Sequence, residues 1–96
     1  MTIDGYVERD ETVIWRDIGG EVVIVGQEDS TVRMLNETAS YIWSLADGTM
    51  RIEDIADALC HRFDVPADEA RADVEQFCSE LLEAELATTH DLPQGF

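Results

Sequence analysis

Basic side chains are scarce in this sequence. Its 96 residues include six basic ones, all of them arginines scattered singly along the chain, against 22 acidic residues, so the formal net charge is −16. Nucleic-acid-binding proteins neutralise phosphates with clustered Lys or Arg. The composition therefore argues against a nucleic-acid partner. It leaves two explanations for the excess of acidic residues: they form a solvated surface, or they bind the surface of a basic partner.

Long apolar runs are also missing. No run approaches the roughly 20 residues that a helix needs to cross a bilayer. The start of the chain, MTIDG, lacks the basic and apolar segments of a secretory signal. We expect a cytoplasmic protein without a membrane partner.

Residues typical of catalytic and metal sites are few. Cys60 and Cys78 form neither a Cys-x-x-Cys pair nor a Cys/His zinc pattern, and both fall on apolar helical stripes, so we expect them to be small core residues. His61 and His90 stand alone, and Gly-Gly at 19–20 precedes no helix. The sequence predicts no enzyme, no metal and no cofactor.

The first part of the chain has the pattern of strands. Residues 12–18 are β-branched and aromatic, the pair Gly19-Gly20 is typical of a two-residue hairpin, and 21–25 form the returning strand. A third strand is expected at 31–35. We expect a three-stranded antiparallel meander, preceded at 1–11 by a flexible arm or a short added strand.

The second part has helical periodicity. Asn36 is placed to cap a first helix that ends at Asp47-Gly48, and a second apolar stripe spans 52–63. Pro66 suits the first turn of a third helix, and the tail at 88–96 is expected to be flexible. The prediction is one α+β domain at 12–87, with three strands followed by three helices, similar to a winged helix with its hairpin in front.

The third strand of this meander has an open edge. It carries one charge, Arg33, and no proline, so its backbone groups are either covered or used. A groove between this strand and a helix, lined by Val32, Met34 or Leu35, would accept an extended peptide by strand addition. Coverage of the edge by the helices or by the N-terminal arm is an equal alternative, and pairing with a second copy would give a homodimer.

Several segments together resemble one protein family. VRMLNETA at 32–39, YIW at 41–43, DGT at 47–49 and IA at 55–56 are similar to the PqqD family, the recognition element (RRE) of pathways that modify ribosomally made peptides. The similarity runs from about Trp15 to Ala87 and includes the third-helix pattern Asp73, Val74, Phe77, Leu81 and Leu86. One departure is Glu85, where the family usually has glycine.

The resemblance implies a function without chemistry of its own. Such domains bind the leader region of a precursor peptide as an added strand, opposite a wall formed by the third helix, and a partner enzyme modifies the peptide. That enzyme is commonly a radical S-adenosylmethionine enzyme; a protease or a cyclase is an alternative. The positions carried over are Thr31, Val32, Arg33, Met34 and Leu35 on the strand and Arg71, Val74, Glu75 and Cys78 on the helix.

In this reading, Arg33 and Arg71 pair with acidic leader residues. Two other functions remain open. A winged-helix DNA-binding regulator matches the architecture, but the third helix is rich in Asp and Glu. An accessory subunit that binds its enzyme and no peptide is the other alternative.

Overall fold

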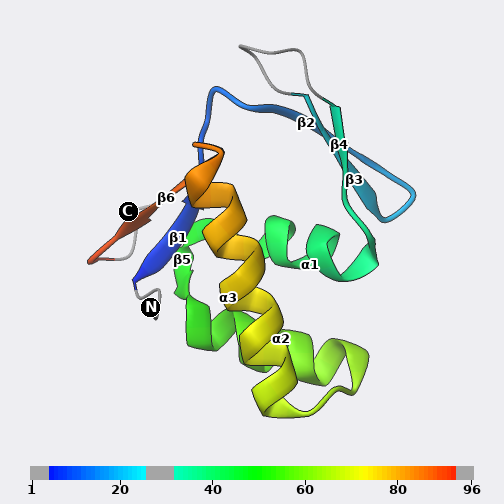
Figure 1. Ribbon diagram of the computed structural model, residues 1–96, viewed down its shortest axis with the longest axis vertical. Coiled ribbons are helices and arrows are strands. Elements are labelled where there is room, and N and C mark those ends of the chain that lie inside the picture. The colour runs from blue at the N-terminus through cyan, green and yellow to red at the C-terminus, as the bar shows by residue number, and fades with distance from the viewer. Residues whose placement is uncertain (1–4, 26–31, 93–96) are drawn as a thin grey trace.

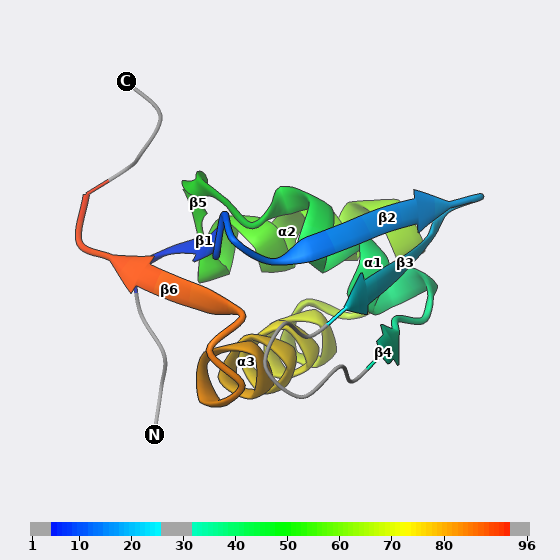
Figure 2. The same cartoon turned by 90° about the horizontal axis from the view of Figure 1, so that it is seen from above.

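The fold is α+β, with a three-stranded antiparallel sheet followed by three helices and with a second small sheet. The computed structural model describes residues 5–25 and 32–92. Its elements are β1 (Tyr6–Arg9), β2 (Ile14–Ile18), β3 (Glu21–Val25), β4 (Val32–Met34), α1 (Glu37–Leu45), β5 (Asp47–Arg51), α2 (Ile52–Phe63), α3 (Ala67–Glu83) and β6 (Ala87–His90). The two sheets lie apart, and α3 packs against α2 with its C-terminal end beside β6 (Figures 1 and 2).

The predicted meander is confirmed as the sheet with strand order β2-β3-β4. Gly19 and Gly20 form the tight turn between β2 and β3 with φ of 64° and 95°, a conformation that glycine adopts without steric cost. Val22 and Ile24 of β3 point into the core. Thr31, expected in the third strand, lies outside the described residues.

The three helices lie where the periodicity predicts them. Asn36 caps α1, its Oδ1 accepting the backbone N–H of Ala39 at 2.8 Å. Pro66 is the N-cap residue of α3, one position before the helix. Apolar stripes of all three helices enter one core, with Trp43, Ile55 and Leu59 among its most buried members. No helix in the described segments has the length and apolarity of a membrane span.

The second sheet differs from the sequence-based expectation. Its order is β5-β1-β6, so the segment expected as a flexible arm or a short added strand (1–11) supplies the central strand, and the segment expected as a tail (88–96) overlaps an outer one. Val7 of β1 is fully buried. Asp47-Gly48, expected only as a helix stop, begins β5 after α1 has ended at Leu45. Unlike β2 and β3, which flank a Gly-Gly hairpin, the strands of this sheet pair with partners distant in the sequence, so no local turn signal indicates them.

One arginine ties this second sheet to α1 and to the meander. Arg9 of β1 donates from Nη1 to the backbone carbonyls of Trp43 at 2.6 Å and Ser44 at 3.2 Å, near the C-terminus of α1. Its guanidinium carbon lies 5.2 Å from the ring centre of Trp15, which packs edge-on against Trp43 at 5.9 Å. A cation at the last carbonyls of a helix is stabilising, so β1 is an integral part of the fold.

A groove beside strand β4

Strand β4 forms an edge of its sheet. In the described part of the chain it pairs with β3 alone. Leu35 donates its N–H to the carbonyl of Val22 at 2.9 Å, and the register then continues with Arg33 opposite Ile24. Hydrogen-bonded and non-hydrogen-bonded pairs alternate along an antiparallel ladder. The backbone N–H and C=O groups of Val32 and Met34 therefore point away from β3, toward the open edge.

The two faces of β4 differ in chemistry. Arg33 shares the inner face of the sheet with Ile24, because directly paired residues point to the same side. Val32 and Met34 lie on the outer face and are 60% and 75% exposed. Exposed apolar side chains thus lie on β4, as expected for a weakly protected edge strand.

A groove separates β4 from α3. Its first part, the α1-side pocket, has a volume of about 390 Å³ and is lined by Met34, Leu35, Asn36, Thr38, Ala39, Ile42, Asp73, Gln76, Phe77 and Glu80. Its second part, the C-terminal pocket, measures about 190 Å³ and adds Ile24, Arg33, Leu81 and Leu86. Both parts share Met34, Leu35, Phe77 and Glu80, so together they form one channel, the β4–α3 groove. Figure 2 shows its two walls, with β4 to the right of α3.

The helical residues carried over from the resemblance do not line this groove. Val74 and Cys78 are fully buried beneath α3 and line neither pocket. Burial raises the pKa of the Cys78 thiol to about 12, so it stays protonated at neutral pH. Arg71 and Glu75 form an ion pair with each other at 2.7 Å and line neither pocket.

The α3 residues that line the α1-side pocket lie on the neighbouring face of the helix: Asp73, Gln76, Phe77 and Glu80; Leu81 is added in the C-terminal pocket. Helical spacing of three and four residues brings them to one side. Phe77 belongs to the third-helix pattern of the resemblance, and it lies at the border of the core, partly buried and lining the groove. A stripe read from sequence locates the centre of the buried face, and its margins depend on what packs against it.

Ser40 was not singled out from the sequence, yet it fixes the strand that forms the groove. Its hydroxyl accepts the backbone N–H of Val22 at 2.8 Å and donates to the carbonyl of Leu35 at 3.2 Å. Ser40 is 4% exposed. A single buried hydroxyl of α1 thus bonds both β3 and the residue that follows β4.

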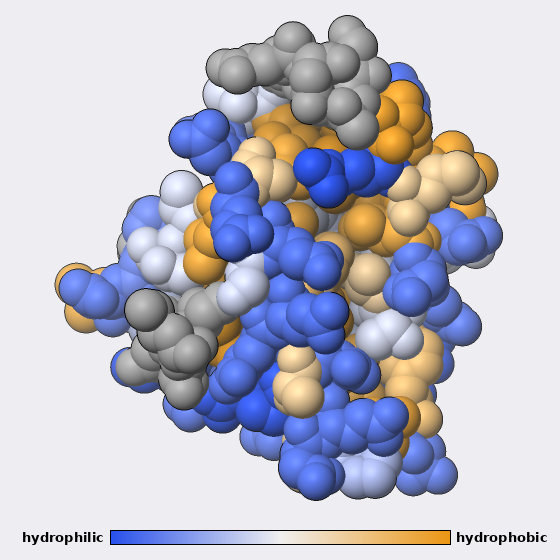
Figure 3. All heavy atoms as spheres, viewed as in Figure 1, coloured by the Kyte–Doolittle hydropathy of each residue, from blue (hydrophilic) through white to orange (hydrophobic). Residues whose placement is uncertain are grey.

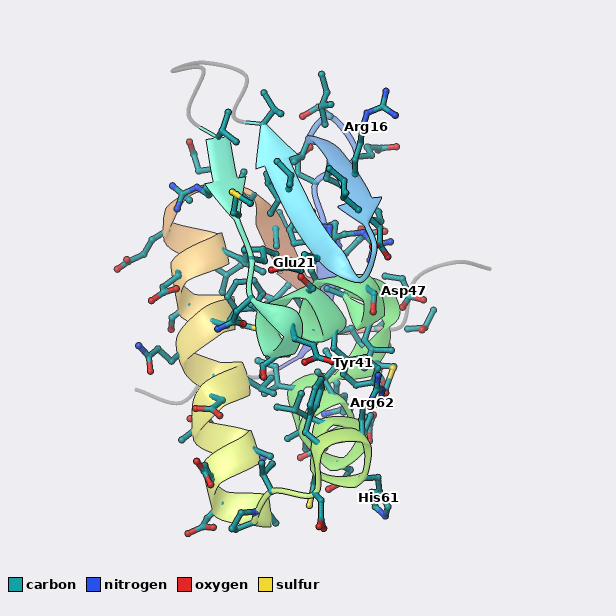
Figure 4. The ribbon with its side chains drawn as sticks, turned by 90° about the vertical axis from the view of Figure 1, so that its right-hand side faces the viewer. Arg16, Glu21, Tyr41, Asp47, His61 and Arg62 are labelled. Atoms are coloured by element: carbon teal, nitrogen blue, oxygen red, sulfur yellow. The ribbon has the colours of Figure 1, made fainter. Side chains whose placement is uncertain are left out.

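The other edge of this sheet is β2, and it also borders a pocket. That pocket, of about 480 Å³, lies between the β2–β3 hairpin, α1 and α2, and Asp17 of β2 lines it together with Tyr41 and Phe63, which pack edge-on at 5.7 Å. Figure 4 shows Tyr41 beside Arg62 in this region, and His61 at the far end of α2. In the part of the chain that the structure describes, no group of three or more His, Cys, Asp or Glu side chains is placed to hold a metal ion.

Known proteins share this arrangement. The solved structure described as "TbiB1 in Complex with the TbiA(beta) Leader Peptide" is similar with a TM-score of 0.77 and 29% sequence identity, over 86% of this chain and 96% of that one. No curated protein sequence matches significantly. Residues 21–87, from β3 to the first residue of β6, match the family described as Coenzyme PQQ synthesis protein D (PqqD). The meander, the three helices and the match over most of the chain agree with the resemblance found in the sequence, and the chain belongs to the PqqD family.

Proposed function

We propose that the protein binds the leader region of a ribosomally made precursor peptide as an added strand on β4 and presents it to a modifying enzyme, without catalysing a reaction itself. The observation that carries this proposal is the open edge of β4 above a groove. Val32 and Met34 offer backbone donors and acceptors there that are unpaired within residues 5–25 and 32–92, and the groove offers pockets for the peptide side chains. The similar TbiB1 structure contains a leader peptide.

Strand addition divides the work of recognition. Backbone hydrogen bonds to Val32 and Met34 supply affinity that is independent of sequence, while alternate peptide residues enter the α1-side and C-terminal pockets and supply selection. Holding the leader raises the effective concentration of the attached core region at the enzyme, so turnover improves without a catalytic group on this chain.

The partner enzyme needs a docking surface on this protein that is separate from the groove. Ile14, Ile18, Val32 and Met34 are each more than half exposed, and the register places them on the outer face of the sheet with Val25. Exposed apolar residues gather over these strands in Figure 3, whereas the surface over α3 is mainly hydrophilic. A peptide added to β4 would extend this outer face, so an enzyme docked on it would lie directly beside the leader.

DNA binding fits these observations poorly. The exposed positions of α3 include Asp68, Glu69, Asp73, Glu80 and Glu83, which would repel a phosphate backbone. A gel shift at low salt is expected to show no complex.

Peptide binding is tested by selection. A library of mRNA-displayed random 15-residue peptides is passed over the immobilised full-length protein, and enriched sequences are titrated by calorimetry. We expect enrichment, and slowed amide hydrogen exchange at Val32 and Met34 in the complex, because their N–H groups become hydrogen-bonded. No enrichment by a folded protein, or protection elsewhere only, would reject the proposal and leave an enzyme-binding accessory subunit as the alternative.

The enzyme-docking part has a separate test. Ile14→Asp with Ile18→Asp places two carboxylates on the outer face, away from the groove. The affinity for selected peptides is expected to stay unchanged, while modification of a leader-fused substrate by the partner enzyme slows. Equal modification rates with the native chain and with the double variant would remove the outer face from the proposal.

A further inference from the structure

The α3 wall of the β4–α3 groove is acidic. Asp73 and Glu80 are exposed, and both line the α1-side pocket. They are seven positions apart, so they project from the same side of the helix, about 10 Å apart along its axis at 1.5 Å per residue. Gln76 and Phe77 lie between them.

The rest of the α1-side pocket is mixed. Leu35, Ala39, Ile42 and the ring of Phe77 give it hydrocarbon surface, beside the polar Asn36 and Thr38. A side chain that extends from β4 across this pocket to α3 can therefore contact both hydrocarbon surface and a carboxylate. Long cationic side chains match this combination, because Lys and Arg bury their methylene stems while the charged head stays with a polar partner.

None of the basic side chains in the described part of the chain lines the α1-side pocket. Arg71 is paired with Glu75 at 2.7 Å and lines neither pocket. Among the described residues, Arg33 is the basic residue that lines the groove; it borders the C-terminal pocket, which Glu80 also lines, and not the α1-side pocket. The formal net charge of −16 adds a field of the same sign over the whole molecule.

We propose that the peptide recognised by this groove carries a Lys or Arg that enters the α1-side pocket and pairs with Asp73 or Glu80. An apolar residue of the same alternation enters the C-terminal pocket, where Ile24, Leu81 and Leu86 are buried. The two residues are separated by an even number of positions, because alternate residues of a strand point to the same side. This inference rests on the proposed peptide binding, and it differs from the expectation that Arg33 and Arg71 pair with acidic leader residues.

Charge reversal in the groove tests the proposal. The same displayed 15-residue library is selected in parallel against the native chain, D73K/E80K, the neutral D73N/E80Q, and the control E53K/D57K. Glu53 and Asp57 are exposed on α2, and the control changes the net charge by the same amount as D73K/E80K at a site outside the groove. Circular dichroism confirms that each variant folds.

The native chain is expected to enrich Lys and Arg at one position of the bound register, with an apolar residue an even number of positions away. D73K/E80K reverses that preference to Asp and Glu, D73N/E80Q abolishes it, and E53K/D57K keeps it. A selected cationic peptide is expected to lose about tenfold in affinity for D73N/E80Q, as for one or two partly shielded ion pairs.

Two results would overturn the inference while leaving peptide binding intact: enriched peptides without a charge preference, or a preference that E53K/D57K weakens as much as D73N/E80Q does. The first result would show that Asp73 and Glu80 do not select the charge of the peptide. The second would show that the negative charge of the whole molecule, and not these two carboxylates, causes the preference for cationic peptides. Failure to enrich any peptide with the native chain would instead remove the proposed function, and this inference with it.

Discussion

Leu35 donates its backbone N–H to the carbonyl of Val22 at 2.9 Å, and this bond sets which backbone groups of β4 are free. In the alternating pattern that follows, the backbone of Met34 is not hydrogen-bonded to β3, whereas the backbone of Arg33 is hydrogen-bonded to Ile24. Proline at position 33 or 34 would remove one backbone N–H donor, but of these two donors only that of Arg33 is used within the described part of the fold. The edge of a sheet is where proline is tolerated.

Met34→Pro is therefore expected to keep the fold and to lower peptide affinity by about tenfold or more, since it removes an outward donor and places a ring against the incoming strand. Val32→Pro should act in the same way. Arg33→Pro breaks the pairing with Ile24 and lowers the melting temperature instead. Calorimetric titration with a selected peptide, together with thermal melts, separates the two effects. Unchanged affinity of a folded Met34→Pro protein would contradict strand addition at β4.

The buried hydroxyl of Ser40 supports this edge from below. Ser40→Ala leaves the buried N–H of Val22 without its side-chain acceptor, at an expected cost of about 1–3 kcal/mol in the free energy of unfolding. Chemical denaturation measures the change. Ser44→Ala is the matched control, because Ser44 is exposed and its hydroxyl donates within its own helix, to Tyr41. Equal losses for both variants would show that the Ser40 bridge has no special role.

Phe77 and Val74 are three residues apart on α3 and are expected to respond in opposite ways. Val74 is fully buried, so Val74→Ala should lower the free energy of unfolding by about 2 kcal/mol and leave peptide affinity nearly unchanged. Phe77 lines both pockets, so Phe77→Ala should weaken peptide binding several-fold. Denaturation and titration of both variants test this division. A binding defect in Val74→Ala as large as that of Phe77→Ala would return the helical wall to the residues that the sequence first suggested.

The features that the sequence predicted are those that depend on neighbouring residues. The Gly19-Gly20 turn, the Asn36 cap and the apolar stripe from Ile52 to Phe63 depend on local chemistry, and all three were predicted correctly. Neither the second sheet nor the acidic groove wall was predicted. Tyr6 pairs with His90 across 84 positions, and nothing within a four-residue strand announces a partner so distant.

Cys78 gives the protein a pH-dependent stability. Burial raises the pKa of its thiol from 9.0 to about 12, so between these values the unfolded chain releases this proton more readily than the folded one. The contribution of the protonated Cys78 thiol to the free energy of unfolding is complete below pH 9. It is lost as pH rises toward 12, at up to about 1.4 kcal/mol per pH unit. Denaturation series at pH 8, 9 and 10 with the native chain and Cys78→Ala measure it. The loss between pH 9 and 10 should be smaller in Cys78→Ala, and parallel curves would contradict the assignment to Cys78.

Glu85 occupies the position where the PqqD resemblance leads us to expect glycine, and its conformation explains that preference. Its φ is 59°, in the left-handed region. It follows the C-cap Ala84 of α3: Glu85 donates its N–H to Leu82 at 3.1 Å, and Leu86 donates to Leu81 at 2.9 Å. This pair of bonds is the Schellman motif, which turns the chain from α3 into β6 and usually requires glycine at this position.

A non-glycine residue in this conformation costs roughly 1–2 kcal/mol, which the greater freedom of glycine in the unfolded chain partly offsets. Glu85→Gly is therefore expected to raise the free energy of unfolding by about 0.5–1 kcal/mol, with peptide affinity unchanged because Glu85 lines neither pocket. Glu83→Gly is the matched control: it removes the same charge from the last turn of α3 but places glycine in ordinary helix, and it should be destabilising. If both substitutions destabilised the protein alike, the left-handed geometry at Glu85 would not be what strains this turn.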